Sequence, residues 1–199
     1  MPEFLIANEI AKDLPLQRVE VTTPMNEQSA GYIIPENMNP ILIDILGAAE
    51  PFTRGLEDAF ENSPHALISA RRRGHKIEDL IVETRYERLP RLDGKPLIFV
   101  DPALATALTL SGAYKKLVDG ENKYGRIEGP IYIASIVATP FAMKRLRETI
   151  GDRLRGLYAV SCDLLLTEKG YIHGPGLNGI GGGGIGDAGD RFLGVIPVD

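Results

Sequence analysis

The sequence lacks features that mark several protein classes. It contains one cysteine, Cys162, and no tryptophan. A single cysteine cannot form a disulfide within the chain, and no Cys/His spacing typical of structural zinc is present. We therefore expect a protein of a reducing compartment, with the cytoplasm as the default.

Long apolar runs and an excess of positive charge are also missing. The longest apolar stretches, Ile41–Ala49 (interrupted by Asp44) and Ile131–Ala138, are far shorter than the roughly 18 residues of a membrane span. The first residues, MPEFLIANEIAKD, have no basic region typical of a secretory signal. The formal net charge of −5 argues against nucleic-acid binding through a global positive field. We expect neither a membrane nor a nucleic acid as a partner.

Short apolar segments recur along the chain. With 199 residues, 44% of them hydrophobic, the length suits one domain over residues 1–199. Ile-, Val- and Leu-rich runs with little polar alternation are typical of strands covered on both faces. These runs are Ile41–Leu46, His65–Ala70, Leu97–Asp101, Ile131–Val137 and Leu157–Ser161.

Helical spacing of apolar residues lies between these runs. It predicts helices over Ala48–Phe60, between Leu104 and Val118, and over Pro140–Ile150. The last is the clearest, with Thr139 as N-cap and Gly151 after its end. Alternating strands and helices predict an α/β fold, with a mostly parallel sheet and helices on both faces. The charged segment Arg71–Arg88 fits no helix face and is interpreted as a protruding hairpin or a solvated loop.

Three segments could carry chemistry. In Val100–Gly112, an acid after a strand is followed by hydroxyls at Thr106, Thr109 and Ser111 and by a helix, which would suit a phosphorylated ligand. Asp101 could hold ribose hydroxyls or a hydrated Mg²⁺. The alternative is a helix that is merely capped.

The second segment, Gly186–Arg191, has two carboxylates separated by small residues and could lie against a flat ligand, or could be an ordinary Asp/Gly turn. Arg71, Arg72 and Arg73 follow a strand-like run and could meet a diphosphate, or could be a solvated face. The segment His173–Gly194 holds 10 of the 22 glycines. Its GPGLNG formally matches a dinucleotide fingerprint but lacks the strand and helix context, so we reject that reading.

Taken together, DPALATALT (Asp101–Thr109) and GDAGDR (Gly186–Arg191) resemble the uracil phosphoribosyltransferase family. Four further segments match in the expected order, so that the resemblance runs from about Ile6 to Gly194. They are KDLPLQRVEVTTPM (Lys12–Met25), DILGAAEPFTRGLEDAF (Asp44–Phe60), IASIVATP (Ile133–Pro140) and SCDLLLTEKGYI (Ser161–Ile172).

This resemblance implies a type I phosphoribosyltransferase fold, with a β-arm at about residues 71–90 and a glycine-rich base-binding loop at 173–191. It implies transfer of phosphoribose from 5-phosphoribosyl 1-diphosphate (PRPP) to uracil, with Mg²⁺, giving UMP and pyrophosphate in pyrimidine salvage. It also implies a homodimer or higher homo-oligomer, with the Arg71–Arg88 segment similar to an arm exchanged between subunits. By the same resemblance, the catalytic residues are Asp101 and Arg71, and the base site is Tyr171, Ile172, Gly186, Asp187 and Ala188. The PRPP-binding residues are Arg71, Asp101, Ala103, Ala105, Thr106, Ala107 and Thr109.

The chain departs from the family pattern at three places. Gly47 stands where the family has a second diphosphate-binding arginine, for which Arg54 could compensate. About nine extra residues lie before GDAGDR, and a helical region of the family's N-terminal part is missing. Two alternatives therefore stay open: the same fold acting on a different base, and a noncatalytic homologue that binds nucleotides or partners.

Overall fold

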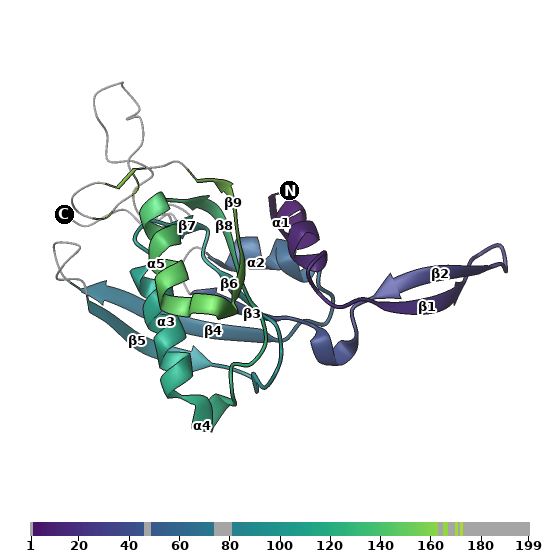
Figure 1. Cartoon of the computed structure of the whole chain (residues 1–199), viewed down its shortest axis with the longest axis horizontal. Coiled ribbons are helices and arrows are strands. Elements are labelled where there is room, and N and C mark those ends of the chain that lie inside the picture. The colour runs from purple at the N-terminus through teal and green to yellow at the C-terminus, as the bar shows by residue number, and fades with distance from the viewer. Residues whose placement is uncertain are drawn as a thin grey trace, which may run out of the picture.

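The fold is a twisted sheet covered by helices, seen in a computed structural model that describes residues 2–45, 49–73, 81–162, 165–166, 170 and 172. Figure 1 shows the sheet at the centre and a separate two-stranded hairpin projecting from it. The helices are α1 (Pro2–Ala11), α2 (Ala49–Glu57), α3 (Leu108–Asp119), α4 (Glu121–Tyr124) and α5 (Pro140–Ile150), with short 3₁₀ turns η1 (Glu36–Met38) and η3 (Gly151–Arg153).

The main sheet has the strand order β5-β4-β3-β6-β8-β9, with the short β7 beside the end of β8. All neighbouring pairs are parallel except β4 with β5. Its strands are β3 (Ile41–Ile45), β4 (His65–Arg73), β5 (Ile81–Arg88), β6 (Leu97–Val100), β7 (Ala103–Leu104), β8 (Ile131–Ala138) and β9 (Leu154–Ser161).

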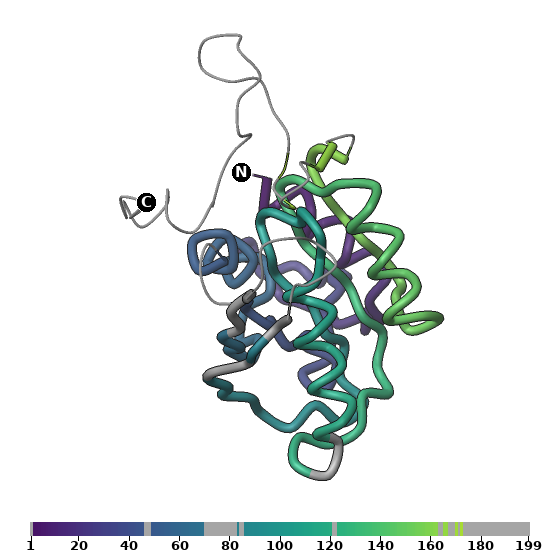
Figure 2. The backbone as a smooth tube through the Cα atoms, turned by 90° about the vertical axis from the view of Figure 1, so that its left-hand side faces the viewer, coloured from purple at the N-terminus to yellow at the C-terminus, as the bar shows by residue number. Residues whose placement is uncertain are grey.

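Two apolar cores lie on opposite faces of this sheet. On one face, α1 and α2 pack through residues such as Ile10, Phe52 and Leu56. On the other, α3 and α5 pack through Leu110 and Leu146, among others. In Figure 2, α2 (blue) and α5 (green) accordingly lie on opposite sides of the molecule. The predicted fold class, a mostly parallel sheet with helices on both faces, is confirmed.

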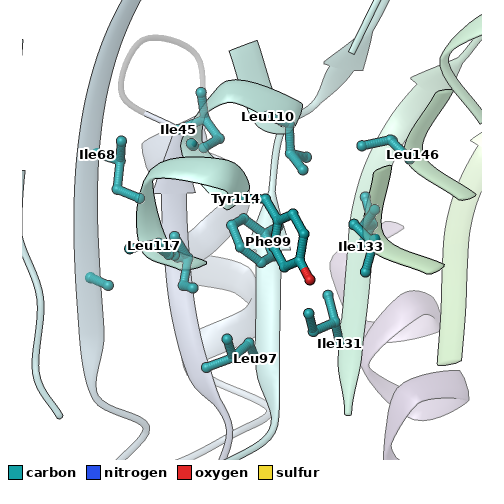
Figure 3. Packing of buried hydrophobic residues seen from close by; sticks show 14 of the residues in the cluster. Ile45, Ile68, Leu97, Phe99, Leu110, Tyr114, Leu117, Ile131, Ile133 and Leu146 are labelled. Atoms are coloured by element: carbon teal, nitrogen blue, oxygen red, sulfur yellow. The ribbon is translucent and has the colours of Figure 1, made fainter. Parts of the chain in front are cut away.

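Aromatic packing anchors α3 to the middle of the sheet. The rings of Phe99 on β6 and Tyr114 on α3 meet edge to face, with centroids 6.4 Å apart. Figure 3 shows them among Leu97, Ile131 and Ile133, all of which are fully buried. Burying one aliphatic side chain stabilises the fold by about 1.5 to 3 kcal/mol relative to leaving it exposed. Burial of these side chains between α3 and the sheet therefore holds α3, and with it the start of the helix, in place on the sheet.

The caps of α5 match the sequence prediction. Thr139 Oγ1 accepts a hydrogen bond from the backbone N–H of Ala142 at 3.0 Å, and Pro140 occupies the first turn. Gly151 follows the helix with a φ of 67°, a conformation that favours glycine. The predicted helix between Leu104 and Val118 begins later, at Leu108, because residues 103–104 pair with β8 instead.

The described residues include two hairpins, of which one was predicted. Within Arg71–Arg88, β4 and β5 pair antiparallel as far as Arg73 and Ile81. The three arginines therefore belong to the strand rather than to a segment after it. The second hairpin, β1 (Gln17–Thr22) with β2 (Gln28–Ile33), was not predicted. It projects furthest from the body in Figure 1.

Candidate active site

The candidate site lies at the edge of the sheet where the parallel strands end. Strand β3 pairs with β4 on one side and with β6 on the other, so the direction of chain progression reverses between β3 and β6. Ligands of open α/β sheets bind outside the carboxyl ends of the strands at such a point. Asp101 directly follows β6 at this place.

Hydrogen bonds to β8 fix the start of the loop after β6. Asp101 donates its backbone N–H to the Ala134 carbonyl at 3.2 Å, and the Pro102 carbonyl accepts from the N–H groups of Ile136 and Val137, both at 3.1 Å. Asp101 Oδ1 accepts the backbone N–H of Ala103 at 3.2 Å. The half-buried Asp101 carboxylate is thereby held on a well-anchored turn at the sheet edge.

The loop enters α3 through a conformation that is unusual for its residues. Ala107 has φ 54° and ψ 16°, in the left-handed region, where a side chain with a Cβ costs about 1 to 2 kcal/mol relative to the right-handed helix. Thr106 is buried, and its Oγ1 accepts the N–H of Leu108 at 3.4 Å. The surrounding packing holds Ala107 in this geometry, as expected where a binding loop must present its backbone.

The first turn of α3 leaves backbone donors available. Within the described part of the chain, the N–H groups of Thr106, Ala107, Thr109 and Leu110 donate no hydrogen bond. The dipole of a helix favours negative charge at this end, and successive free N–H groups form a concavity suited to anions. Such donors are what the phosphate-binding role predicted for Asp101–Thr109 requires.

The structure brings Arg71 to the same edge of the sheet. Ile45, the last residue of β3, aligns with Ile68 of β4. The backbone of Arg71 lies three residues further along β4, where it pairs with Glu83 of β5. The predicted phosphate loop, which follows β6, and the backbone of Arg71, which lies beyond the end of β3, are thus at the same edge of the sheet.

Other predicted residues divide between described and undescribed parts. Ile172 is buried and forms an isolated antiparallel bridge with Leu166. Several predicted residues lie outside the described residues: Gly47, Tyr171, Gly186, Asp187, Ala188 and the glycine-rich loop. Arg54, considered as a substitute cation, pairs with Glu50 on the exposed side of α2 at 2.7 Å.

Two side chains, one at the N-cap of α5 and one within that helix, contact the loop and were not predicted to do so. Thr139 Oγ1 donates to the Ala105 carbonyl at 2.6 Å, and Arg145 Nη1 donates to the Thr106 carbonyl at 3.2 Å. The guanidinium of Arg145 also stacks on the ring of Phe141, and burial lowers its pKa. The sequence predicted Thr139 only as the N-cap of a helix, and no local pattern indicated a contact between Arg145 and the loop.

Ser111, one of the hydroxyls noted in the Val100–Gly112 segment, contacts α5. Ser111 is buried, and its hydroxyl lies 3.5 Å from that of Thr149 on α5. A side chain one turn inside α3 faces the neighbouring helix rather than the loop, so Ser111 packs α3 against α5. Among the described residues, no group of three or more metal-ligating side chains is present, and no helix is long and apolar enough to cross a membrane.

A reversing parallel sheet with a loop that leads from an acidic residue into a helix is the arrangement expected for the fold of type I phosphoribosyltransferases. Solved structures agree. The AQ2163 protein from Aquifex aeolicus superposes with a TM-score of 0.76 at 27% identity, covering 99% of this chain and 84% of that one. A purine phosphoribosyltransferase from Pyrococcus horikoshii has a TM-score of 0.50 at 12% identity, covering 79% and 80%, which supports the fold alone.

The chain belongs to the uracil phosphoribosyltransferase family. The family model of that description matches residues 3–194. The uracil phosphoribosyltransferase of Sulfolobus acidocaldarius is 31% identical over 196 residues, which cover 96% of this chain and 83% of the relative. That of Thermococcus gammatolerans is 32% identical over 188 residues, covering 94% and 75%. The predicted family is confirmed, and the protein is a phosphoribosyltransferase enzyme.

Proposed function

We propose that this enzyme transfers the 5-phosphoribosyl group from PRPP to uracil, giving UMP and pyrophosphate, as a step of pyrimidine salvage. The observation that carries the proposal is the Asp101–Thr109 loop at the point where the sheet reverses, with backbone N–H groups available at the start of α3. Relatives that share about 31% of their residues with this chain are named for uracil.

Different loop residues bind different parts of the phosphoribosyl group. The N–H groups of Thr106, Ala107 and Thr109 bind the 5-phosphate, while Ala103 and Ala105 keep the loop narrow enough for the sugar to approach its backbone. The Asp101 carboxylate accepts hydrogen bonds from the ribose hydroxyls. These contacts hold the anomeric carbon in a fixed place, which is a large part of catalysis when two substrates must meet.

Bond cleavage then needs positive charge at the leaving group. The bond between the anomeric carbon and the diphosphate oxygen breaks, N1 of uracil forms the new bond to that carbon, and the N1 proton is released. Arg71 stabilises the charge that develops on the departing diphosphate, since a guanidinium matches phosphate oxygens in geometry. Tyr171, Ile172, Gly186, Asp187 and Ala188 form the base site by resemblance to the family.

The described donor set fits Mg²⁺ bound mainly through its substrate. Mg²⁺ keeps several waters and takes one or two protein carboxylates together with phosphate oxygens. Asp101 supplies one half-buried carboxylate at the sheet edge, and no larger acidic cluster is found among the described residues. When bound, the ion neutralises diphosphate charge, and Asp101 is the residue that would hold it.

We also propose that the enzyme is a homo-oligomer, joined through the β1–β2 hairpin. A two-stranded hairpin is marginally stable alone in water. On one face of the hairpin, Val21 and Ile33 are exposed, with exposed fractions of 45% and 48%. A second copy would cover this apolar surface.

We place the enzyme in the cytoplasm, as expected for a chain with one cysteine.

A panel of acceptors tests the proposed reaction. Purified protein is incubated with PRPP, Mg²⁺ and one base, either uracil, hypoxanthine, adenine or guanine, and nucleotides are separated by chromatography. Product with uracil alone supports the proposal. If product forms only with another base, that base rather than uracil is the acceptor. If no base gives product, calorimetric titration with PRPP separates an enzyme that lacks its acceptor from a noncatalytic homologue, which would bind PRPP weakly or not at all.

A further inference from the structure

The carbonyl groups of three consecutive residues, Leu104–Thr106, all accept hydrogen bonds from Thr139, which precedes α5, or from Arg145 within α5. The Leu104 carbonyl accepts from the backbone N–H of Thr139 at 3.0 Å. The Ala105 carbonyl accepts from Thr139 Oγ1 at 2.6 Å, and the Thr106 carbonyl accepts from Arg145 Nη1 at 3.2 Å. We call Thr139 and Arg145, acting on these carbonyls, the α5 clamp.

The α5 clamp sets the direction of the N–H groups on the opposite side of the same peptide units. A peptide unit is planar and, when trans, its C=O and N–H point in opposite directions. The described part of the chain contains no cis peptide. Holding the carbonyls of Ala105 and Thr106 toward α5 therefore turns the N–H groups of Thr106 and Ala107 away from α5. These are two of the free donors at the start of α3.

We propose that Arg145 is a positioning residue for the 5-phosphate of PRPP, acting through the Thr106 carbonyl to aim the Ala107 N–H at the phosphate. The inference rests on the proposed function. Without the guanidinium, the peptide between Thr106 and Ala107 would rotate more freely, because Ala107 is in a left-handed conformation that local propensity disfavours. The loop would then spend part of its time with that donor misdirected.

The surroundings of Arg145 support a fixed position for its side chain. The guanidinium carbon lies 4.8 Å from the centre of the Phe141 ring, one helical turn earlier on α5. Stacking of this kind fixes the plane of a guanidinium. Arg145 is also partly buried, unlike Arg147, which is exposed on the same helix. A partly buried cation with one defined acceptor is suited to holding a loop.

Arg145 is a better test of the α5 clamp than Thr139. Thr139 Oγ1 also accepts the N–H of Ala142 as the N-cap of α5, so its removal would weaken the helix as well as the loop. Arg145 has no such second role among the described hydrogen bonds. The Arg145→Met variant keeps much of the aliphatic length, and Arg145→Lys keeps a charged donor. Arg147→Met is the matched control.

The test is the effect of Arg145→Met on PRPP and on the base separately. We expect KM for PRPP to rise about tenfold, as for the loss of one charge-assisted hydrogen bond, with KM for the base and the melting temperature nearly unchanged. Arg145→Lys should restore most of the PRPP affinity, and Arg147→Met should resemble the wild type. An unchanged KM for PRPP in Arg145→Met, or equal rises of both KM values with a lower melting temperature, would overturn the positioning role.

Calorimetric titration with PRPP and Mg²⁺, without any base, separates this inference from the proposed reaction. If the wild type binds PRPP and Arg145→Met binds about tenfold more weakly, the α5 clamp is supported whichever base is the acceptor. If both bind equally well, the clamp is wrong while the proposed function stands. If the wild type does not bind PRPP, the proposed function fails and the positioning role falls with it.

Discussion

Lys116 Nζ lies 2.8 Å from Glu87 Oε2 and thereby joins α3 to β5, the strand at the edge of the sheet. The other oxygen of Glu87 accepts from the Tyr124 hydroxyl and from Lys123 Nζ, both on α4. These hydrogen bonds hold the pKa of Glu87 well below its usual range, at about 2. One carboxylate therefore ties β5, α3 and α4 together at the lateral edge of the sheet.

Glu87→Gln should lower the free energy of unfolding by about 1 to 2 kcal/mol at pH 7, a discounted value because the lysines are at the surface and screened by salt. A carboxyl group with a lowered pKa in the folded state stabilises the protein above its unfolded pKa and loses that effect as the pH falls. The difference between wild type and variant should therefore shrink between pH 4.5 and about 2. Urea unfolding at a series of pH values measures it. Glu128→Gln, at an exposed ion pair, is the control, and an equal loss there would refute the special role of Glu87.

Asp44 is buried in β3, where its carboxylate accepts a hydrogen bond from the Thr53 hydroxyl on α2. Burial raises the pKa of Asp44. Thr53→Val should cost about 1 to 3 kcal/mol, because it leaves a buried carboxylate without its donor. Thr53→Ser keeps the hydroxyl and should cost much less. Chemical denaturation compares the two, and equal losses would show that methyl packing rather than the hydrogen bond matters.

Asp44→Asn should leave stability unchanged or increase it at pH 7. An acid whose pKa is raised by folding costs stability when it is ionised, and that cost disappears as the pH falls through the raised pKa toward the unfolded value. The variant lacks the charge, so its advantage over the wild type should vanish near pH 3.8, the ordinary pKa of the group. Thermal unfolding at pH 7 and in acid gives both values. A destabilised Asp44→Asn at pH 7 would mean that the ionised carboxylate is required.

The proposed homo-oligomer is tested on the β1–β2 hairpin. Val19, Val21 and Ile33 share one of its faces, with both valines packed over Gly31. Val21→Asp should shift the protein toward monomers in sedimentation velocity, because a charge would be buried at the interface. Thr22→Asp, on the opposite face of the same strand, is the matched control. A monomeric wild type, or an assembly that is unaffected by Val21→Asp, would contradict the proposed interface.

Local patterns predicted the central sheet and its main helices well. Ile41–Ile45 and Ile131–Ala138 are buried on both faces, so their apolar runs were direct signals, and the Thr139 cap defined the start of α5. The β1 strand has only Val19 and Val21 as apolar residues, among polar and charged neighbours, and is mostly exposed, so its pattern gave little indication of a strand. Asp44 looked like an interruption of an apolar run, although Thr53 satisfies it inside the core.

The residues of the proposed site could be recognised in the sequence where they are consecutive, whereas contacts that the fold makes to them could not. Asp101–Thr109 forms one loop, and its acid and hydroxyls are visible in the sequence. Arg145 contacts that loop from 39 residues away. Such a contact depends on how α5 packs beside α3, which no local periodicity encodes. Ser111 was one of three hydroxyls noted in the Val100–Gly112 segment, and its hydroxyl lies beside that of Thr149 on α5.

The central claim is that Asp101 and its loop hold the phosphoribosyl group during transfer to uracil. The most direct measurement is the initial rate of UMP formation from uracil, PRPP and Mg²⁺ by the wild type and by Asp101→Asn, whose amide oxygen can still accept the Ala103 N–H. The account predicts UMP formation by the wild type and a rate lower by about 100-fold or more in the variant, the scale found when a transition-state contact is removed. A variant that forms UMP as fast as the wild type would contradict it.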